Sequence, residues 1–217
     1  MIKAVIFDLD GLIADTEIIE SHALELLLKE YDKKPKYYPN GLIHIAGLAG
    51  DSMWITLKKT YAIDADITTL RNRKREIFEE LIKKELKPYD GFIELLNILK
   101  KNRLKLALAS NRFVKHIDLI LEELGVTKYF DVVVGPSEKR RHKPHPDIYL
   151  ETAKQLGIKP EFCLALEDTE HGINSAVAAG MKAIAIPNTY TKVYNFAHAK
   201  KVVNSLQSVT IELINSL

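Results

Sequence analysis

Cysteine is almost missing from this chain, and long apolar runs are missing as well. The 217 residues include one cysteine, Cys163, so no disulfide framework is possible. No apolar run approaches the roughly 20 residues that a membrane-spanning helix needs. The first residues also lack the basic, apolar and small-residue pattern of a signal peptide. These absences predict a cytoplasmic protein with no membrane partner.

An excess of one charge is missing too. The chain has 31 basic and 29 acidic residues and a net charge of +2, so no overall field favours nucleic acid. The basic run 71–75 shares an expected helix with apolar residues, and we interpret it as a solvated helix face. The apolar share of 47% is enough for a sizeable core. Nothing in the sequence sets the oligomeric state, and a monomer is our expectation.

The order of the apolar patterns predicts an α/β fold. Buried strands and one short edge strand are expected at 2–7, 104–109, 131–134, 162–166, 183–186 and 201–203. Helical spacing between these strands, followed by a last helix at 206–217, predicts a doubly wound parallel sheet. Between the first two strands the patterns are helical only. We therefore expect an α/β core at 1–15 and 89–217, with a helical cap domain inserted at 16–88.

Polar residues lie where the predicted strands end. They are Asp8 and Asp10 after the first strand, Ser110 and Asn111 after the second, Lys143 beyond the third, and Glu167 and Asp168 after the fourth. Ligands of such folds bind beyond the carboxyl ends of the strands, so we expect one shared site. Three carboxylates, those of Asp8, Asp10 and Asp168, with Glu167 behind them, suit a hard cation such as Mg²⁺.

This combination indicates metal-assisted phosphoryl transfer. Asp8 can act as the nucleophile, while Asp10 protonates the leaving alcohol and then takes a proton from water. Ser110 and Asn111 offer a hydroxyl and an amide to phosphate oxygens, and Lys143 offsets the repulsion between carboxylate and phosphate. Each residue alone has a plainer explanation: Ser110 and Asn111 also suit a helix cap, and Lys143 could be a surface lysine.

The motifs around these residues resemble those of the haloacid dehalogenase superfamily of phosphohydrolases, and of its β-phosphoglucomutase-like branch with a helical cap. The matching stretches are Asp8-Leu-Asp10-Gly11 with Asp15-Thr16-Glu17, Ser110-Asn111, Lys143-Pro-His-Pro-Asp147 and Leu166-Glu-Asp-Thr-Glu-His-Gly172. The resemblance implies Asp8 as nucleophile and Asp10 as acid and base. It also implies Mg²⁺ on Asp8, the Asp10 carbonyl and Asp168, with Glu167 in support, and a cap that closes over the substrate.

Two departures argue against a sugar-phosphate mutase. Glu20 stands where the mutases of this branch carry a cap histidine, and their Gly-x-x-Arg stretch reads Gly47-Leu-Ala-Gly50 here. We therefore predict a phosphatase that acts on a small phosphorylated metabolite, with a mutase as the alternative. More remote alternatives are a phospho-accepting signalling module, which would carry its acceptor on an internal strand, and an inactive relative that binds partners through the cap.

Overall fold

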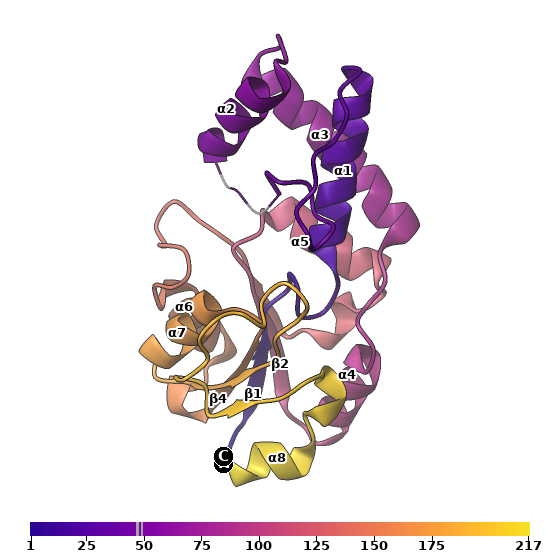
Figure 1. Ribbon diagram of the computed structural model, residues 1–217. Helices are drawn as coiled ribbons and strands as arrows, with labels where there is room; N and C mark the ends of the chain where they lie inside the picture. Colours follow the sequence, from indigo (N-terminus) through magenta and orange to yellow (C-terminus); the bar gives the residue numbers. More distant parts are fainter. Residues whose placement is uncertain (47, 49) are drawn as a thin grey trace. The chain divides into compact units, whose positions relative to one another are not determined.

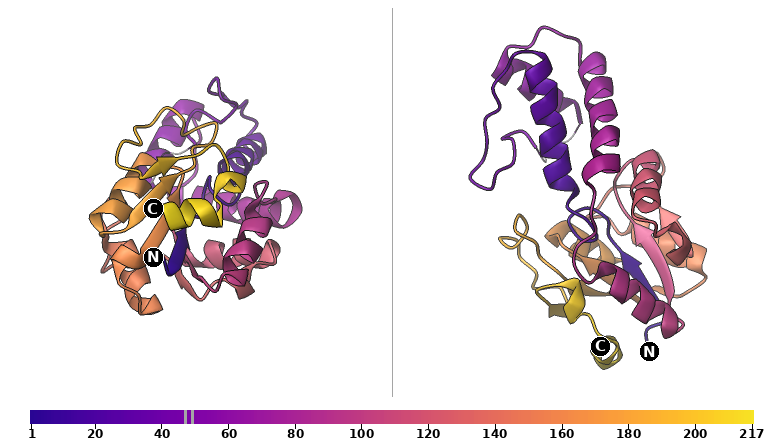
Figure 2. Two further views of the ribbon diagram at one scale, coloured as in Figure 1. Left: turned by 90° about the horizontal axis from the view of Figure 1, so that it is seen from below. Right: turned by 90° about the vertical axis from the view of Figure 1, so that its right-hand side faces the viewer.

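The computed structural model describes residues 1–46, 48 and 50–217, which form two compact units (Figure 1). Unit 1 consists of Met1–Ala14 and Lys87–Leu217, and unit 2 of Asp15–Leu86. Figure 2 shows the two termini close together at one end of unit 1. No helix in the described part of the chain is both long enough and apolar enough to span a bilayer.

Unit 1 is built on a parallel sheet of six strands in the order β3-β2-β1-β4-β5-β6. The strands are β1 (Ala4–Phe7), β2 (Lys105–Ala109), β3 (Val132–Val134), β4 (Cys163–Glu167), β5 (Lys182–Ala185) and β6 (Lys201–Val202). The chain starts in the middle of the sheet, builds outward on one side and then returns to build outward on the other. This topology confirms the predicted doubly wound α/β fold, and it puts the switch in strand order at β1.

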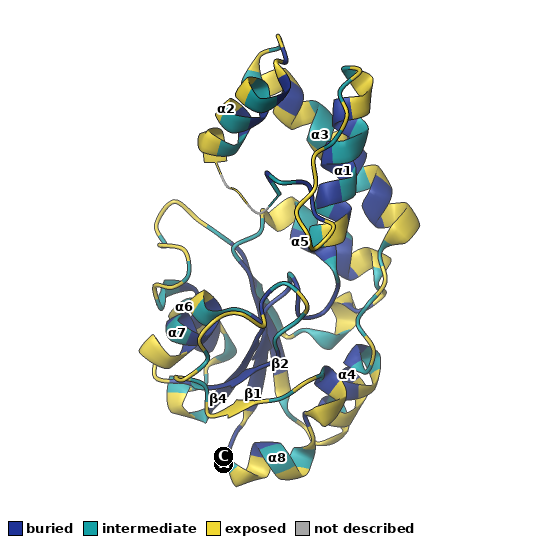
Figure 3. Ribbon diagram, in the orientation of Figure 1, coloured by how far each residue is buried: buried dark blue, intermediate teal, exposed yellow. Residues whose placement is uncertain are grey.

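The two faces of the sheet bury alternate side chains, as the period of a strand requires. Ala4 and Ile6 belong to a core that α6 (Asp147–Leu156) and α7 (Glu170–Ala178) cover. The ring of Phe7 packs instead against Phe92 of α4 (Phe92–Lys101), with 5.9 Å between ring centroids. Figure 3 shows the central strands β1 and β4 as buried and the helices with an exposed outer side, whereas the edge strand β6 is exposed. The helices of unit 1 are α4 (Phe92–Lys101), α5 (Val114–Glu123), α6 (Asp147–Leu156), α7 (Glu170–Ala178) and α8 (Ile211–Ser216), with short 3₁₀ turns at Thr127–Tyr129, Pro160–Phe162 and Leu206–Ser208.

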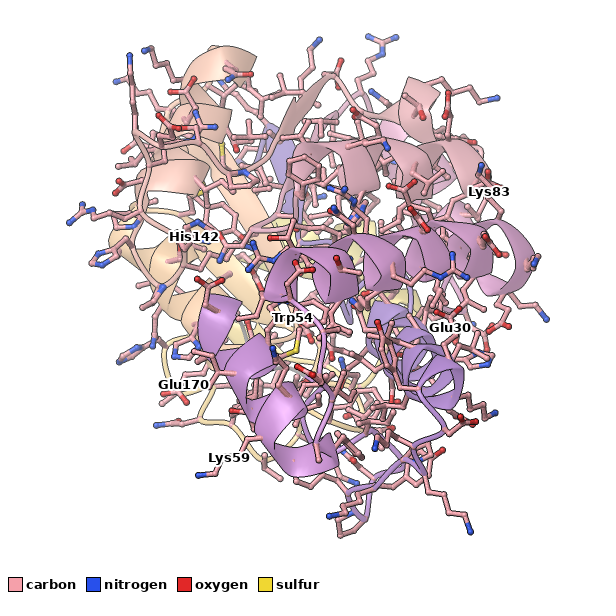
Figure 4. All side chains as sticks on the ribbon, turned by 90° about the horizontal axis from the view of Figure 1, so that it is seen from above. Glu30, Trp54, Lys59, Lys83, His142 and Glu170 are labelled. Atoms are coloured by element: carbon pink, nitrogen blue, oxygen red, sulfur yellow. The ribbon has the colours of Figure 1, made fainter. Side chains whose placement is uncertain are left out.

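The described residues of unit 2 form three helices, α1 (Thr16–Glu30), α2 (Gly50–Tyr61) and α3 (Ile67–Glu85). The carboxylate of Asp15 accepts a hydrogen bond from the backbone N–H of Ile18, at 3.2 Å, and so caps α1 as its acidic start predicts. Asp66 caps α3 in the same way. Trp54 on α2, labelled in Figure 4, is buried and so packs within unit 2.

The basic run at 71–75 is paired within unit 2. Arg73 of α3 donates two hydrogen bonds to Oε1 of Glu30 at the end of α1, labelled in Figure 4, with its Nη2 at 2.7 Å from that oxygen. Arg71 pairs with Asp51, and Lys74 pairs with Glu20. Acidic side chains of neighbouring helices pair with these three cations. The Arg71 and Arg73 side chains are 49% and 40% exposed, as a solvated helix face predicts, whereas that of Lys74 is only 15% exposed.

The last helix was expected at 206–217, but the structure has a 3₁₀ turn at Leu206–Ser208 and then a separate helix, α8. The break comes at Thr210, whose hydroxyl caps α8 by accepting a hydrogen bond from Leu213 N, while Val209 is buried beside it. In the stretch Gly47-Leu-Ala-Gly50, residues 47 and 49 lie outside the described residues.

Candidate active site

The carboxyl ends of β2, β1 and β4 bring the predicted site residues to one edge of the sheet. Phe7 of β1 is in register with Leu108 of β2 and Leu166 of β4, so the residues that follow them emerge at the same level. The backbone N–H of Asp8 donates to the carbonyl of Leu166 at 3.0 Å, and that of Ser110 donates to Val134 at 3.1 Å. Parallel pairing therefore continues up to the first polar residue of each exit.

Lys143 is a buried ammonium that joins two of these exits. Its Nζ lies 2.5 Å from Oδ1 of Asp8, 2.5 Å from Oε1 of Glu167 and 2.9 Å from the carbonyl oxygen of Ala109. The side chain is only 6% exposed. Three donors thus meet three acceptors, and the plainer explanation of Lys143 as a surface lysine is wrong.

Glu167 is held so firmly that it serves best as an anchor for Lys143. The hydroxyl of Tyr149 donates to Oε1 of Glu167 at 2.6 Å, which is the same oxygen that Lys143 contacts. Gly172 of α7 lies directly against this carboxylate, and a Cβ at that position would overlap it. Glu167 is buried, with Lys143, Tyr149 and Gly172 around its carboxylate.

Asp10 has a partner that sequence reasoning missed. Nε of Arg112 lies 2.6 Å from Oδ1 of Asp10, and the Arg112 side chain is 10% exposed. The hydroxyl of Ser110 lies 3.5 Å from Oδ2 of Asp10 and accepts a hydrogen bond from the backbone N–H of Arg112 at 3.0 Å. One short segment after β2 therefore fixes both oxygens of Asp10. Arg112 directly follows the predicted pair Ser110 and Asn111, and that adjacency was the available signal.

Asn111 lies beside the backbone of Lys143. Its Oδ1 accepts a hydrogen bond from the backbone N–H of Lys143 at 3.4 Å, so it links the loop after β2 to the loop that carries the lysine. The alternative in which Ser110 and Asn111 cap the next helix is wrong, because α5 begins after Phe113 and has no side-chain cap. Asn111 stays a predicted phosphate contact.

Asp168 completes a group of three carboxylates that could hold a metal ion. One oxygen from each of Asp8, Glu167 and Asp168 lies within 4.8 Å of the others. Asp168 is 2% exposed, and its Oδ1 has no hydrogen-bond partner among the described residues. A buried carboxylate oxygen without a donor is unfavourable unless a cation occupies its open side, so these residues fit a hard metal ion. The Asp10 side chain is not in this group.

Asn188, in the loop after β5, is a second residue that sequence reasoning missed. Its Nδ2 donates to Oδ2 of Asp168 at 2.9 Å and to the carbonyl of Gly11 at 3.0 Å. Asn188 follows a predicted strand within three residues, so the rule that found the other exits also applied to this one.

The titration of the cluster reflects burial and crowding. Burial raises the pKa of Asp8 above its ordinary value, Lys143 opposes that rise, and Glu167 and Asp10 add to it. Burial also raises the pKa of Asp168, and the charges of Asp8 and Glu167 raise it further. Burial lowers the pKa of Lys143, but the two carboxylates raise it by more. The cluster therefore has more negative charge than one lysine can offset, which favours binding of a cation.

A comparison with known families identifies the family of this chain. The family model described as Haloacid dehalogenase-like hydrolase matches residues 5–186. The chain belongs to this family. Its membership confirms the resemblance and sets aside the signalling-module alternative.

Relatives of this hydrolase include phosphatases and a mutase. A phosphorylated carbohydrates phosphatase from Thermotoga maritima is 31% identical over 186 residues, covering 84% of this chain and 83% of that protein. The β-phosphoglucomutase of Bacillus subtilis is 31% identical over 220 residues, covering 98% and 94%. The fructose-1-phosphate phosphatase YqaB of Escherichia coli is 29% identical over 184 residues, covering 84% and 95%. The names of these relatives and membership of the hydrolase family support phosphatase activity in this chain.

Solved structures share the fold over the whole chain. The β-phosphoglucomutase pgmB of Clostridium difficile superposes with a TM-score of 0.75 at 27% identity, covering 100% of this chain and 96% of that one. CbbY of Rhodobacter sphaeroides, solved with phosphate, gives a TM-score of 0.80 at 24% identity with 96% of each chain covered. At 24% identity, the comparison with CbbY shows only that the fold is shared.

Proposed function

We propose that this hydrolase is a Mg²⁺-dependent phosphatase that acts on phosphomonoesters of small metabolites, sugar phosphates among them. The observation that carries the proposal is the buried pair of Lys143 with Asp8 at the exit of β1. A carboxylate can approach a phosphate dianion only where positive charge offsets the repulsion, and Lys143 supplies that charge inside the protein. Relatives named for phosphorylated carbohydrates and for fructose 1-phosphate support this substrate class.

We infer that the reaction uses the two aspartates at the exit of β1 in turn. An oxygen of Asp8 attacks phosphorus, so that an O–P bond forms while the bond from phosphorus to the ester oxygen breaks. Asp10 gives its proton to that ester oxygen, and the alcohol leaves neutral. Asp10 then takes a proton from a water molecule as the water oxygen attacks phosphorus. The bond to Asp8 breaks, and inorganic phosphate is released.

The remaining residues hold the reacting groups and the metal. Asp8 and Asp168 would hold Mg²⁺, together with the Asp10 carbonyl that the family resemblance implies, and Glu167 would keep Lys143 in place. When bound, Mg²⁺ would offset the charge of the phosphate and of the carboxylates around it. The buried Ser110 hydroxyl would contact a phosphate oxygen, since it already lies beside Asp10.

A sugar-phosphate mutase is the second candidate, because one relative bears that name. Glu20 argues against it, since its carboxylate pairs with Lys74 of α3, where a mutase would need a free histidine. We also propose that residues 16–88, which cover unit 2 except for Asp15, act as the cap that selects the substrate. A phosphatase should release phosphate from glucose 1-phosphate or glucose 6-phosphate, if it accepts them, without interconverting the two.

The decisive experiment measures phosphate released from sugar phosphates, polyol phosphates, nucleotides and phosphoglycolate with Mg²⁺, using the wild type and two variants. Asp8→Asn should reduce turnover to background, and Asp10→Asn should reduce it by about 10²- to 10⁴-fold, since proton transfer contributes that much. Asp66→Asn is the matched control, because asparagine caps a helix as well as aspartate does. Turnover that survives in Asp8→Asn would disprove the nucleophile assignment.

A further inference from the structure

Asn188 is fixed by four hydrogen bonds, and they define which way its amide points. Its Nδ2 donates to Oδ2 of Asp168 and to the carbonyl of Gly11. Its Oδ1 accepts from the backbone N–H groups of Tyr190 at 2.8 Å and Thr191 at 3.1 Å. A flipped amide would set its oxygen against two acceptors and its nitrogen against two donors, so only one orientation satisfies the site.

This contact makes the two oxygens of Asp168 unequal. Oδ2 is occupied by the Asn188 amide, whereas Oδ1 is buried with no donor among the residues that the structure describes. Gly11 allows the approach, because a Cβ there would overlap both Oδ2 of Asp168 and Nδ2 of Asn188. Three segments that are far apart in sequence therefore meet so that Asp168 presents a single oxygen.

We propose that Asn188 is a positioning residue that keeps Asp168 a one-oxygen ligand and thereby favours Mg²⁺ over Ca²⁺. This inference rests on the metal requirement of the proposed function. Mg²⁺ demands near-octahedral geometry at about 2.0–2.1 Å, which suits carboxylates that each give one oxygen. Ca²⁺ accepts longer distances, more ligands and bidentate carboxylates. A carboxylate whose second oxygen is hydrogen-bonded to an amide can give one oxygen to Mg²⁺. It cannot give both oxygens to Ca²⁺.

The expected size of the effect follows from how outer partners act on metal ligands. Loss of a hydrogen-bond partner of a metal ligand typically lowers metal affinity by about 10- to 100-fold. In Asn188→Leu, which keeps the branching at Cγ and the number of heavy atoms but removes both donors, Asp168 can rotate and offer both oxygens. We expect the dissociation constant for Mg²⁺ to rise by about 10- to 100-fold and that for Ca²⁺ to rise by clearly less, so the preference for Mg²⁺ falls.

The experiment uses the full chain freed of metal with a chelator and contains no substrate. Thermal unfolding is followed across a series of MgCl₂ concentrations and, separately, of CaCl₂ concentrations, and the rise in melting temperature yields each dissociation constant. Thr191→Val is the matched control. It removes the hydroxyl that accepts from Asn188 N at 3.0 Å and so perturbs the same loop, but it leaves the donors to Asp168 in place. Its preference for Mg²⁺ should match that of the wild type within about two-fold.

Two results would overturn the inference. One is an unchanged ratio of the two dissociation constants in Asn188→Leu, and the other is an equal fall in that ratio in Thr191→Val. If circular dichroism shows that Asn188→Leu is unfolded, Asn188→Ala replaces it, since alanine adds no atom to the site. Failure of the proposed function gives a different pattern. A wild type that binds Mg²⁺ but releases no phosphate refutes the phosphatase and leaves the role of Asn188 standing.

Discussion

Replacing Lys143 with methionine tests the charge balance of the site, because methionine keeps most of the apolar stem and removes the ammonium. The change leaves Asp8 and Glu167 without their shared cation, at side-chain exposures of 11% and 1%. Removing one partner of a buried ion pair costs about 3–5 kcal/mol. We expect the lower end, about 3 kcal/mol at pH 8, because Asp8, whose pKa is already raised by burial, can take up a proton once the ammonium is gone.

The pH dependence of this loss has a definite sign. The pKa of Asp8 is raised in the folded state, so the folded protein binds its proton more tightly than the unfolded chain does. Stability from such a group is present at low pH and is lost as the pH rises through the folded-state pKa. Without Lys143 the pKa of Asp8 rises further. Lys143→Met should therefore cost less stability at pH 5 than at pH 8.

Urea unfolding followed by circular dichroism, with chelator present, measures these differences. At pH 8 the melting temperature should also fall by about 6–12 °C, which is 3 kcal/mol at 2–4 °C per kcal/mol for a chain of this size. Lys105→Met is the matched control. Lys105 pairs with Asp131 at 3.0 Å, but its side chain is 57% exposed, and such a surface pair contributes at most about 1 kcal/mol.

Phosphatase activity gives a second, independent measure of the same substitution. Loss of a preorganised positive group at the reacting atoms should lower kcat by about 10²- to 10³-fold. A Lys143→Met protein that is as stable as Lys105→Met at pH 8 would refute the reasoning, because it would mean that Asp8 and Glu167 do not depend on the buried ammonium.

Further predictions concern Asp131 and Arg112. Burial raises the pKa of Asp131, but hydrogen bonds from Lys100 and from Leu106 N outweigh it and lower the pKa to about 2. Asp131→Asn should then cost about 1 kcal/mol at pH 7, after allowance for solvent screening, and the cost should vanish as the pH falls from about 4 to 2 in urea titrations. Arg112→Gln should slow the hydrolysis of alkyl phosphates about ten-fold or more. It should hardly affect p-nitrophenyl phosphate, whose leaving group needs no proton, and should add little to Asp10→Asn; an additive loss would contradict a role through Asp10.

Much of the core site could be predicted from the sequence, because the alternation of side chains along a strand and the parallel pairing of strands determine where its residues lie. Strand alternation and parallel pairing require Asp8, Ser110, Glu167 and Asp168 to emerge at one edge, whatever the details of packing. Lys143 could be predicted only through the motif around it, since its long side chain reaches the site from a loop. The burial of its ammonium was not visible in the sequence.

Arg112 and Tyr149 could not be predicted as parts of the site from strand patterns. The contact between Arg112 and Asp10 depends on how one long side chain turns back over its own loop, and no spacing encodes that. Tyr149 reaches Glu167 only because of the rotation of α6 about its axis. The break in the last expected helix at Thr210 depends on local capping, whereas apolar spacing continues across it.

The close packing of Gly172 against Glu167 offers a way to separate shape from charge. Gly172→Ala would add one methyl group and alter no ionisable residue, yet that carbon would push the Glu167 carboxylate away from Lys143 and Tyr149. Every acid and base of the site would still be present, in the wrong places. This position, in the first turn of α7, therefore controls the charge network by shape alone, through the place of the Glu167 carboxylate.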